Sequence, residues 1–289
     1  MSGNSKGLDT ARTIADLRAT ERRWRAAGHT IGLVPTMGGL HEGHIALVRR
    51  ALAVCDRVVV SIFVNPRQFG SADDLAQYPR REAEDCAKLA QAGAHLAFIP
   101  AVEEMYPPGS VTTVSVAGPL TQTLDAVHRP GHFDGVTTVV GKLFLQALPD
   151  VAFFGAKDYQ QLQIVTRMAR DLDIPLRVEA VPTVRDADGL ALSSRNLNLS
   201  ADQRRIAAAF PAALFAAVER LVQGGDVEAT LAAAWRAVLR AGFDNVDYIE
   251  LADAETLSPI RVLGPAPARL FGAATIGRTR LIDNMPIPA

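Results

Sequence analysis

Short apolar runs alternate with segments of helical periodicity through residues 10–181. The runs have the length of buried strands, and we predict strands at residues 30–34, 57–64, 94–100, 151–154 and 176–181. Around them the apolar positions recur at helical spacing, which predicts helices over residues 10–27, 45–52, 78–92, 136–147 and 159–171. Strands that alternate with helices are typical of a parallel sheet with right-handed crossovers.

The pattern changes near Ser200, where the chain becomes rich in alanine. Two helices are predicted at residues 202–222 and 227–241, and three strands at residues 247–251, 268–274 and 279–284. The β-rich residues 111–116 are expected at a sheet edge, and residues 259–267 in a surface loop. We therefore predict an α/β fold with a Rossmann-like parallel sheet domain over residues 1–186. A smaller C-terminal α+β domain over residues 187–289 is expected, hinged near residues 186–200.

Composition narrows the class of protein. The 289 residues are 48% hydrophobic, enough for a packed core, yet no apolar run is long enough to cross a bilayer. Residues 1–7 lack the apolar core of a signal peptide and are expected to form a short disordered leader. Two cysteines favour a reducing compartment, and a net charge of −1 gives no reason to expect nucleic acid as a partner. We expect a soluble cytoplasmic protein without membrane partners.

Residues 34–44, Val-Pro-Thr-Met-Gly-Gly-Leu-His-Glu-Gly-His, join the strand at residues 30–34 to the helix that follows. Open α/β sheets bind nucleotides at such crossings. Gly38 and Gly39 allow a ligand close to the backbone, and free N–H groups at the helix start attract phosphate. His41 and His44 are three residues apart, which places both rings on one side of the helix start. An imidazole there can donate to a phosphoryl oxygen whose charge grows in a transition state.

Two other interpretations of this histidine pair stay open. The pair could be two surface histidines, or half of a metal site. It does not follow the zinc-protease pattern His-Glu-x-x-His, and no cluster of cysteines or carboxylates lies nearby in the sequence. Because the glycines, the strand and the helix coincide, we favour phosphate binding and expect no metal held by the protein.

Three further polar clusters follow predicted strands or the predicted hinge. Gln68 offers an amide donor and acceptor for a small polar substrate, and Lys157, with Gln161 one helical turn later, can neutralise a phosphate or carboxylate. The cluster Ser193-Ser194-Arg195 resembles a phosphate clamp. The alternatives are a loop glutamine facing water, a solvated lysine and an ordinary turn. Their positions at the expected carboxyl edge of the sheet, and at the hinge, favour substrate and phosphate binding.

These motifs together resemble the pantoate–β-alanine ligase (pantothenate synthetase) family of the nucleotidylyltransferase superfamily. Residues 35–44 are similar to the superfamily's first signature, related to the HIGH motif of class I tRNA synthetases, and residues 193–196 resemble the counterpart of the mobile KMSKS loop. Other matching segments are residues 61–69, 129–133, 154–162 and 281–284. The resemblance runs from about residue 30 to residue 284. Any one motif would be weak evidence, but six motifs in the family's order along the chain are specific for this family.

The resemblance implies a two-step reaction. The carboxylate of pantoate attacks the α-phosphorus of ATP, and the amine of β-alanine then attacks the acyl carbon of pantoyl adenylate, giving pantothenate and AMP. His44 is implied as proton donor with His41 and Lys157 beside it, and Gln68 and Gln161 as pantoate residues, Gln68 also near β-alanine. The implied ATP contacts are Met37, Gly38, Gly39, Leu40, His41, Glu42, Gly43, His44, Gly155, Ala156, Lys157, Asp158, Val184, Leu192, Ser193, Ser194 and Arg195. Mg²⁺ carried mainly by the phosphates and a homodimer are also implied.

The sequence departs from the family at two positions. Ala156 stands where a glutamate is usual, so that side chain is not needed, and Arg67 replaces a common methionine and is expected to add charge near the substrate site. Two rival functions also stay open: a nucleotidyltransferase that makes a lasting nucleotide product, and a nucleotide-binding regulator. The amides of Gln68 and Gln161 argue against the first, and the intact histidine, lysine and serine–arginine motifs against the second.

Overall fold

The computed structural model describes residues 7–288, which divide into two compact units. Unit 1 takes the chain up to Val116 together with Gly131–Ala156 and Ile164–Val181. Unit 2 takes Ala117–Pro130, Lys157–Gln163 and the chain from Pro182 onward. The single boundary predicted at residues 186–187 differs from this division, because unit 2 includes two earlier segments. The predicted leader lies, apart from Gly7, outside the described residues.

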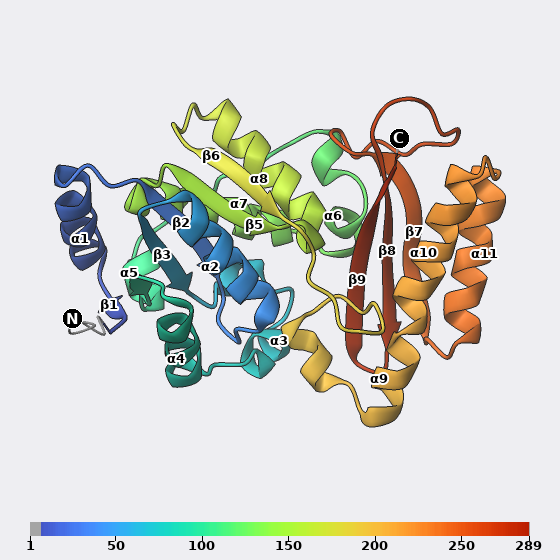
Figure 1. The fold of residues 1–289 in the computed structure, drawn as a ribbon, viewed down its shortest axis with the longest axis horizontal. Helices are drawn as coiled ribbons and strands as arrows, with labels where there is room; N and C mark the ends of the chain where they lie inside the picture. Colours follow the sequence, from blue (N-terminus) through green and yellow to red (C-terminus); the bar gives the residue numbers. More distant parts are fainter. Residues whose placement is uncertain (1–6, 289) are drawn as a thin grey trace. The chain divides into compact units, whose positions relative to one another are not determined.

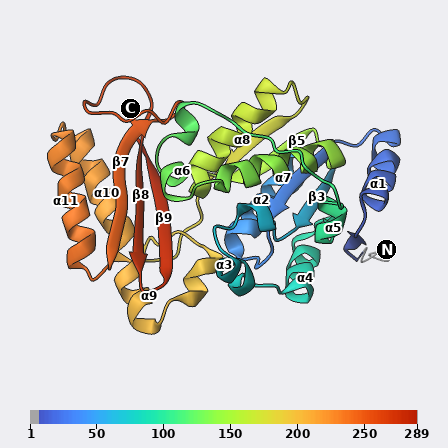
Figure 2. The same ribbon diagram turned by 180° about the vertical axis from the view of Figure 1, so that it is seen from behind.

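Unit 1 is built on a six-stranded parallel sheet in the order β1-β4-β3-β2-β5-β6 (Figures 1 and 2). Its strands are β1 (Asp9–Ala11), β2 (Ile31–Thr36), β3 (Arg57–Ile62), β4 (Leu96–Phe98), β5 (Val151–Gly155) and β6 (Arg177–Val181). The chain leaves β2 towards β3 on one side and later adds β5 on the other. The carboxyl ends of these three strands are therefore neighbours at a topological switch point. The predicted Rossmann-like sheet is confirmed.

Helices cover both faces of this sheet. The helix α1 (Ile14–Ala26) packs against α7 (His132–Ala147), and α2 (Glu42–Val54) packs against α4 (Glu82–Ala92). Figures 1 and 2 view the unit from opposite sides, with α2 in front of the strands in one and α7 in the other. The remaining helices are α3 (Ala72–Gln77), α5 (Val102–Met105) and α8 (Tyr159–Asp171), whose first residues belong to unit 2.

Three local predictions in unit 1 are wrong. The first helix starts at Ile14 rather than residue 10, because the preceding residues pair with β4. The helix predicted from residue 78 starts at Glu82, because Tyr78 is the C-cap of the separate helix α3 and Arg81 is the N-cap of α4. Residues 111–116 form no strand. There the backbone of Val114 bonds to the hydroxyls of Thr137 and Thr138 on α7, which serve in place of a neighbouring strand.

Unit 2 pairs a three-stranded antiparallel sheet with helices. The strands β7 (Asn245–Asp253), β8 (Ala268–Ile276) and β9 (Thr279–Ile287) pack against α10 (Ala209–Val222) and α11 (Val227–Arg240). The helix predicted at residues 202–222 is divided, because α9 (Ala201–Ala207) ends before α10 begins. Pro211 lies in the first turn of α10, where a missing N–H is tolerated, whereas in the interior of one long helix it would remove a hydrogen bond. Residues 259–267 form the predicted loop, apart from one isolated bridge at Pro259.

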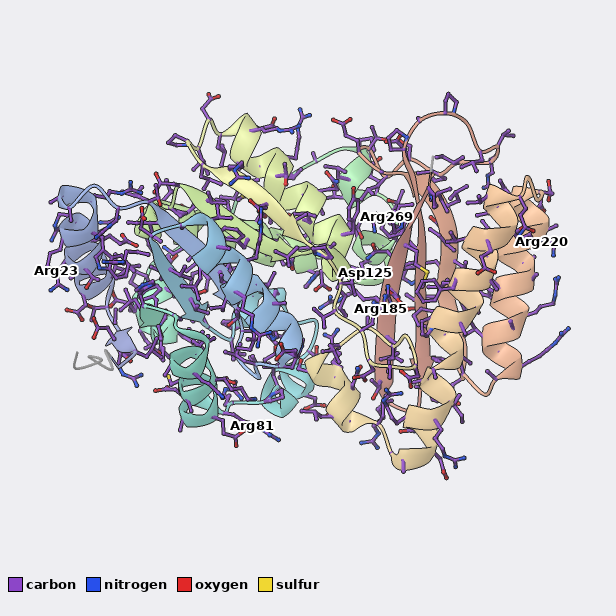
Figure 3. The ribbon with its side chains drawn as sticks, viewed as in Figure 1. Arg23, Arg81, Asp125, Arg185, Arg220 and Arg269 are labelled. Atoms are coloured by element: carbon purple, nitrogen blue, oxygen red, sulfur yellow. The ribbon has the colours of Figure 1, made fainter. Side chains whose placement is uncertain are left out.

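The other face of this sheet holds a buried ion pair. Arg280 on β9 donates to Asp125 of α6 (Asp125–His128) at 2.7 Å, and the Tyr248 hydroxyl donates to the same carboxylate at 2.7 Å. Burial opposes ionisation of Asp125, but Arg280 outweighs it and holds the pKa of this carboxyl below its usual value. Asp125, Arg185 and Arg269, labelled in Figure 3, all lie close to β9. No helix within residues 7–288 has both the length and the apolar character that a membrane span requires.

Glu21 on α1 is buried without a hydrogen-bond partner for Oε1, and burial raises its pKa to about 8 against the opposing charges of Arg25 and Arg18. The folded state therefore binds a proton that the unfolded chain releases above pH 4.5. This contribution to stability is complete below pH 4.5, declines as the pH rises and is lost above about pH 8.

We expect Glu21→Gln to stabilise the protein by about 1–3 kcal/mol at pH 8 and to leave stability almost unchanged at pH 4.5. Urea unfolding at several pH values measures this difference. A wild-type and variant difference that did not grow with pH would contradict the raised pKa.

Candidate active site

The two predicted histidines form the cap of α2. His41 is the N-cap residue, and its Nδ1 accepts from the N–H of Gly43 at 3.2 Å. His44 reaches back, and its Nδ1 accepts from the N–H of His41 at 3.3 Å. The ring centroids are 4.1 Å apart. The prediction that both rings lie on one side of the helix start is confirmed.

This cap fixes the tautomer of both rings. A ring nitrogen that accepts a backbone N–H carries no proton, so in the neutral imidazole the proton sits on Nε2. His41 and His44 both use Nδ1 in this way. Each ring therefore presents an Nε2–H donor on the side away from its backbone bond. Two such donors side by side suit a phosphate oxygen.

The glycine turn differs from its predicted role as a phosphate cradle. The Asp85 carboxylate of α4 accepts from the N–H of Gly39 and from the N–H of Leu40, each at 2.8 Å. At the helix start, the N–H groups of Gly43 and His44 bond to His41. These backbone donors are occupied, so the expectation that they are free for phosphate is wrong.

Sequence reasoning missed the role of α4. Asp85 is only 1% exposed, and Lys88 on the same helix donates from Nζ to the Leu40 carbonyl at 2.6 Å. Gly38 has φ +81°, and a side chain there would press on the Asp85 carboxylate. The turn thus keeps its shape through a close fit between glycine and a buried acid. An acidic residue on a helix is too common for its sequence alone to signal this.

We expect Asp85→Asn to raise the KM for ATP about tenfold and to lower stability by about 1–3 kcal/mol. The amide replaces one acceptor oxygen with a donor, which leaves one turn N–H without a partner and loosens the segment that carries the histidines. Steady-state kinetics and urea unfolding measure the two effects. Asp73→Asn, at an exposed position on α3, is the matched control. Unchanged ATP kinetics in a destabilised Asp85→Asn protein would refute the positioning role.

Gln68 lies at the end of the short helix η1 (Pro66–Gln68), directly after β3. Its side-chain nitrogen contacts the sulfur of Met37 at 2.9 Å, which links Gln68 to the glycine turn. Gly155 ends β5, the strand on the other side of β2, and Ala156 follows it. The unit 1 residues predicted for ATP and pantoate therefore gather at one edge of one sheet.

Three of the predicted residues of unit 2, Lys157, Ser193 and Arg195, line one pocket. The other predicted residues of this unit lie outside its lining: Asp158, Gln161, Val184, Leu192 and Ser194. The Nδ2 of Asn284 donates to the backbone carbonyl of Lys157 at 2.7 Å. The Nζ of Lys157 lies 3.4 Å from Oδ1 of Asp158. Ser193 caps the short helix η4 (Ser194–Asn198) by accepting from the N–H of Arg195. The residues around the pocket are Lys157, Leu190, Ala191, Ser193, Arg195, Asn196, Phe210, Arg280, Leu281, Ile282 and Asp283. The lysine and the serine–arginine cluster, predicted separately, thus meet.

Cations dominate the polar lining of this pocket. Arg280 and Asp283 are engaged elsewhere, since Arg280 pairs with Asp125 and Asp247, and Asp283 pairs with Arg185 at 2.6 and 2.8 Å. Lys157 and Arg195 are the other cations of the lining. The pocket therefore suits an anion.

The loop predicted as a hinge is fastened within unit 2. Arg185, besides its pair with Asp283, donates to the Gly189 carbonyl, and Arg204 of α9 pairs with Asp186 and Asp188. The backbone N–H of Leu192 donates to the carbonyl of Val184, which places these two predicted residues opposite each other. These bonds tie residues 185–192 to the sheet and helices of their own unit. Gln161, the predicted substrate residue of unit 2, is half-buried in the first turn of α8.

The comparisons with known proteins agree with this arrangement. Open α/β sheets bind nucleotides at such a switch point, and the pocket of unit 2 suits an anion, so the fold and the site are those of a nucleotide-binding protein. The family model for pantoate-beta-alanine ligase matches residues 9–286, so the chain belongs to the pantoate-beta-alanine ligase family.

Individual relatives support the same assignment. The pantothenate synthetase of Chelativorans sp. is 56% identical over 276 residues, which cover 96% of both chains. A pantothenate synthetase from Thermus thermophilus superposes with a TM-score of 0.93 at 48% identity, covering 98% of this chain and 100% of its own. A pantoate-beta-alanine ligase from Francisella tularensis, solved with beta-gamma ATP and beta-alanine, has a TM-score of 0.81 at 32% identity over 97% of this chain and 98% of its own.

Proposed function

We propose that the protein joins pantoate to β-alanine through pantoyl adenylate. A carboxylate oxygen of pantoate forms a bond to the α-phosphorus of ATP, and the bond to the β-phosphate bridging oxygen breaks, releasing pyrophosphate. The amine of β-alanine then bonds to the acyl carbon and loses a proton, while AMP leaves with the former carboxylate oxygen. The carboxylate is ionised at neutral pH, so the first step needs alignment and charge neutralisation more than a base.

In this proposal unit 1 binds the reacting end of ATP. His44, with His41 beside it, donates through Nε2–H to phosphate oxygens whose charge grows as the α-phosphorus is attacked. The turn residues Met37 to Gly43 and the β5 residues Gly155 and Ala156 line the nucleotide. The cap geometry supports these roles, because it directs the proton of each ring to the outer nitrogen.

In this proposal unit 2 binds the β- and γ-phosphates of ATP, which leave as pyrophosphate, and the adenine. Lys157 neutralises phosphate charge with Asp158 beside it, and Ser193, Ser194 and Arg195 hold the β- and γ-phosphates. Val184 and Leu192 border the adenine. The domain roles predicted from the sequence, nucleotide binding for residues 1–186 and a lid for residues 187–289, belong to this proposal.

Gln68 and Gln161 are the proposed pantoate residues, with Gln68 also near β-alanine. We also propose that Mg²⁺ takes part, carried mainly by the phosphates of ATP. When bound, it would neutralise phosphate charge. We further propose a cytoplasmic homodimer, following the family resemblance.

The unit 2 pocket is the observation that carries the proposal, because Lys157 and the segment that holds Ser193 and Arg195 are far apart in the sequence and line one cavity. A coupled assay for AMP tests it, with pantoate, β-alanine or ATP omitted in turn. We expect AMP in the complete mixture. Steady release of AMP should be lost when pantoate is omitted and also when β-alanine is omitted. A lasting nucleotidyl product would favour a nucleotidyltransferase, and ATP binding without pantoate-dependent pyrophosphate release would favour a regulator.

A further inference from the structure

Asp283 and Asn284 are neighbours on β9, in the last of the segments that match the family, and neither is among the proposed substrate contacts. Each is only 3% exposed, so each polar side chain needs a partner inside the protein. Successive side chains of a strand point to opposite faces of the sheet. Leu281 and Met285, which share the face of Asp283, belong to the core cluster that includes α10 and α11. Asn284 faces the other way, so the two side chains act on different parts of unit 2.

Asn284 holds the backbone of Lys157. Its Nδ2 donates to the Lys157 carbonyl at 2.7 Å, and its Oδ1 accepts from the Arg269 guanidinium. A carbonyl can only accept and a guanidinium can only donate, so exchanging the two amide atoms would lose both bonds. Arg269 in turn lies over the ring of Tyr159, with its Cζ 3.9 Å from the ring centroid. The backbone from which the Lys157 ammonium reaches the pocket is therefore fastened to β9.

Asp283 holds the opposite wall of the same pocket. Both of its oxygens accept from Arg185, at 2.6 and 2.8 Å, in the forked geometry that fixes a guanidinium. The backbone of Arg185 pairs with that of Ala191, and the Ala191 carbonyl accepts from Nδ2 of Asn196 at 3.0 Å. Asn196 follows Arg195 directly in η4. Asp283 is thus connected, through Arg185 and Ala191, to the segment that carries Arg195.

We propose that Asp283 and Asn284 are positioning residues that set the two walls of the anion pocket separately. Asn284 sets Lys157, and Asp283 sets the segment of Ser193 and Arg195. Neither is a phosphate ligand, because both oxygens of Asp283 are used by Arg185 and a second anion would repel a phosphate. The pocket cations are then in place before ATP arrives, so that less ordering is needed on binding. This inference rests on the proposed function, in which the pocket binds the β- and γ-phosphates.

Two substitutions that keep side-chain shape test the roles. Asn284→Asp keeps an oxygen for Arg269 but places a second oxygen against the Lys157 carbonyl, and Asp283→Asn places an amide donor against the Arg185 fork. We expect each to raise the Kd for ATP about tenfold, as misplacing one charged contact would. Titration calorimetry on the full chain measures this Kd. Asp202→Asn, at an exposed position on α9, is the control and should keep the wild-type Kd.

The same substitutions in two further backgrounds separate positioning from general loosening. In a Lys157→Ala protein, Asn284→Asp should change the Kd about threefold or less, whereas Asp283→Asn should keep its full effect, because residues that act through one another are not additive. In an Arg195→Ala protein the order should reverse. A structural defect of unit 2, or repulsion of ATP by the new charge of Asn284→Asp, would persist in both backgrounds.

Equal losses in the two backgrounds would therefore overturn the proposal, as would wild-type Kd values in both single variants. Asp283→Asn removes the ionic partner of a half-buried arginine and could prevent folding. Arg185→Lys then replaces it, since lysine keeps the charge but lacks the fork, and Asn284→Ala likewise replaces Asn284→Asp. Pantoate-dependent AMP release by the wild type is measured in parallel. Its absence would refute the proposed function, while the ATP Kd values would still decide the role of Asp283 and Asn284.

Discussion

His44→Ala is expected to slow pantoyl-adenylate formation by ~10²-fold or more while leaving ATP able to bind. The substitution removes an Nε2–H donor that the helix cap holds in place through Nδ1. Loss of one donor that acts on developing charge has an effect of this size. Single-turnover release of pyrophosphate, with saturating ATP and pantoate, measures the step directly. Near-normal adenylate formation would show that His44 does not stabilise the transition state.

His44→Glu separates this role from the cap. A glutamate at the third position of a capping box accepts the N-cap N–H and favours the helix N-terminus, so the fold should be as stable as the wild type. Without a donor, and with added negative charge, adenylate formation should stay at or below the rate of His44→Ala. A stable His44→Glu protein that recovered the rate would mean that His44 acts only through the helix cap.

Lys157→Ala is expected to lower the single-turnover rate of the first step by about 10²-fold and to raise the KM for ATP. The ammonium lines the unit 2 pocket and its nearest carboxylate is Asp158, at 3.4 Å on an exposed side chain. Such a surface pair contributes little to folding, about 1 kcal/mol at most. The protein should therefore unfold at nearly the wild-type urea concentration.

Arg220→Ala is the matched control for Lys157, because it removes one positive charge from an exposed position in unit 2. Its kinetics should equal those of the wild type. A wild-type rate in Lys157→Ala would place the phosphates away from this pocket. Equal losses in both variants would show that overall charge, rather than contact, is responsible.

The hydrophobic pattern predicted most of the elements because they depend on local periodicity. The strands β2, β3, β5 and β6 and the helices α7, α8 and α11 were found within a few residues of their ends. The wrong predictions share a cause. Residues 111–116 have the composition of a strand, but their backbone bonds to threonine hydroxyls of α7, and no local signal reports a partner of that kind.

The site shows the same limit. The motifs indicated Gln68, Lys157 and the histidines as site residues, because each follows a strand or starts a helix at the expected carboxyl edge of the parallel sheet. They did not indicate that Asp85, 46 residues after Gly39, occupies the glycine turn, nor that Asn284 holds the carbonyl of Lys157 from 127 residues away. Such contacts depend on which helix packs against which loop, and only the folded chain reveals them.

The fate of an oxygen atom tests the proposed chemistry most directly. With pantoate labelled by ¹⁸O in its carboxylate, together with β-alanine and ATP, attack on the α-phosphorus must transfer one labelled oxygen from each pantoate to AMP. Mass spectrometry of the nucleotide product detects it. We predict AMP with a single ¹⁸O in its phosphate and unlabelled pyrophosphate. Unlabelled nucleotide with ¹⁸O in inorganic phosphate would show attack on the terminal phosphate and contradict the adenylate.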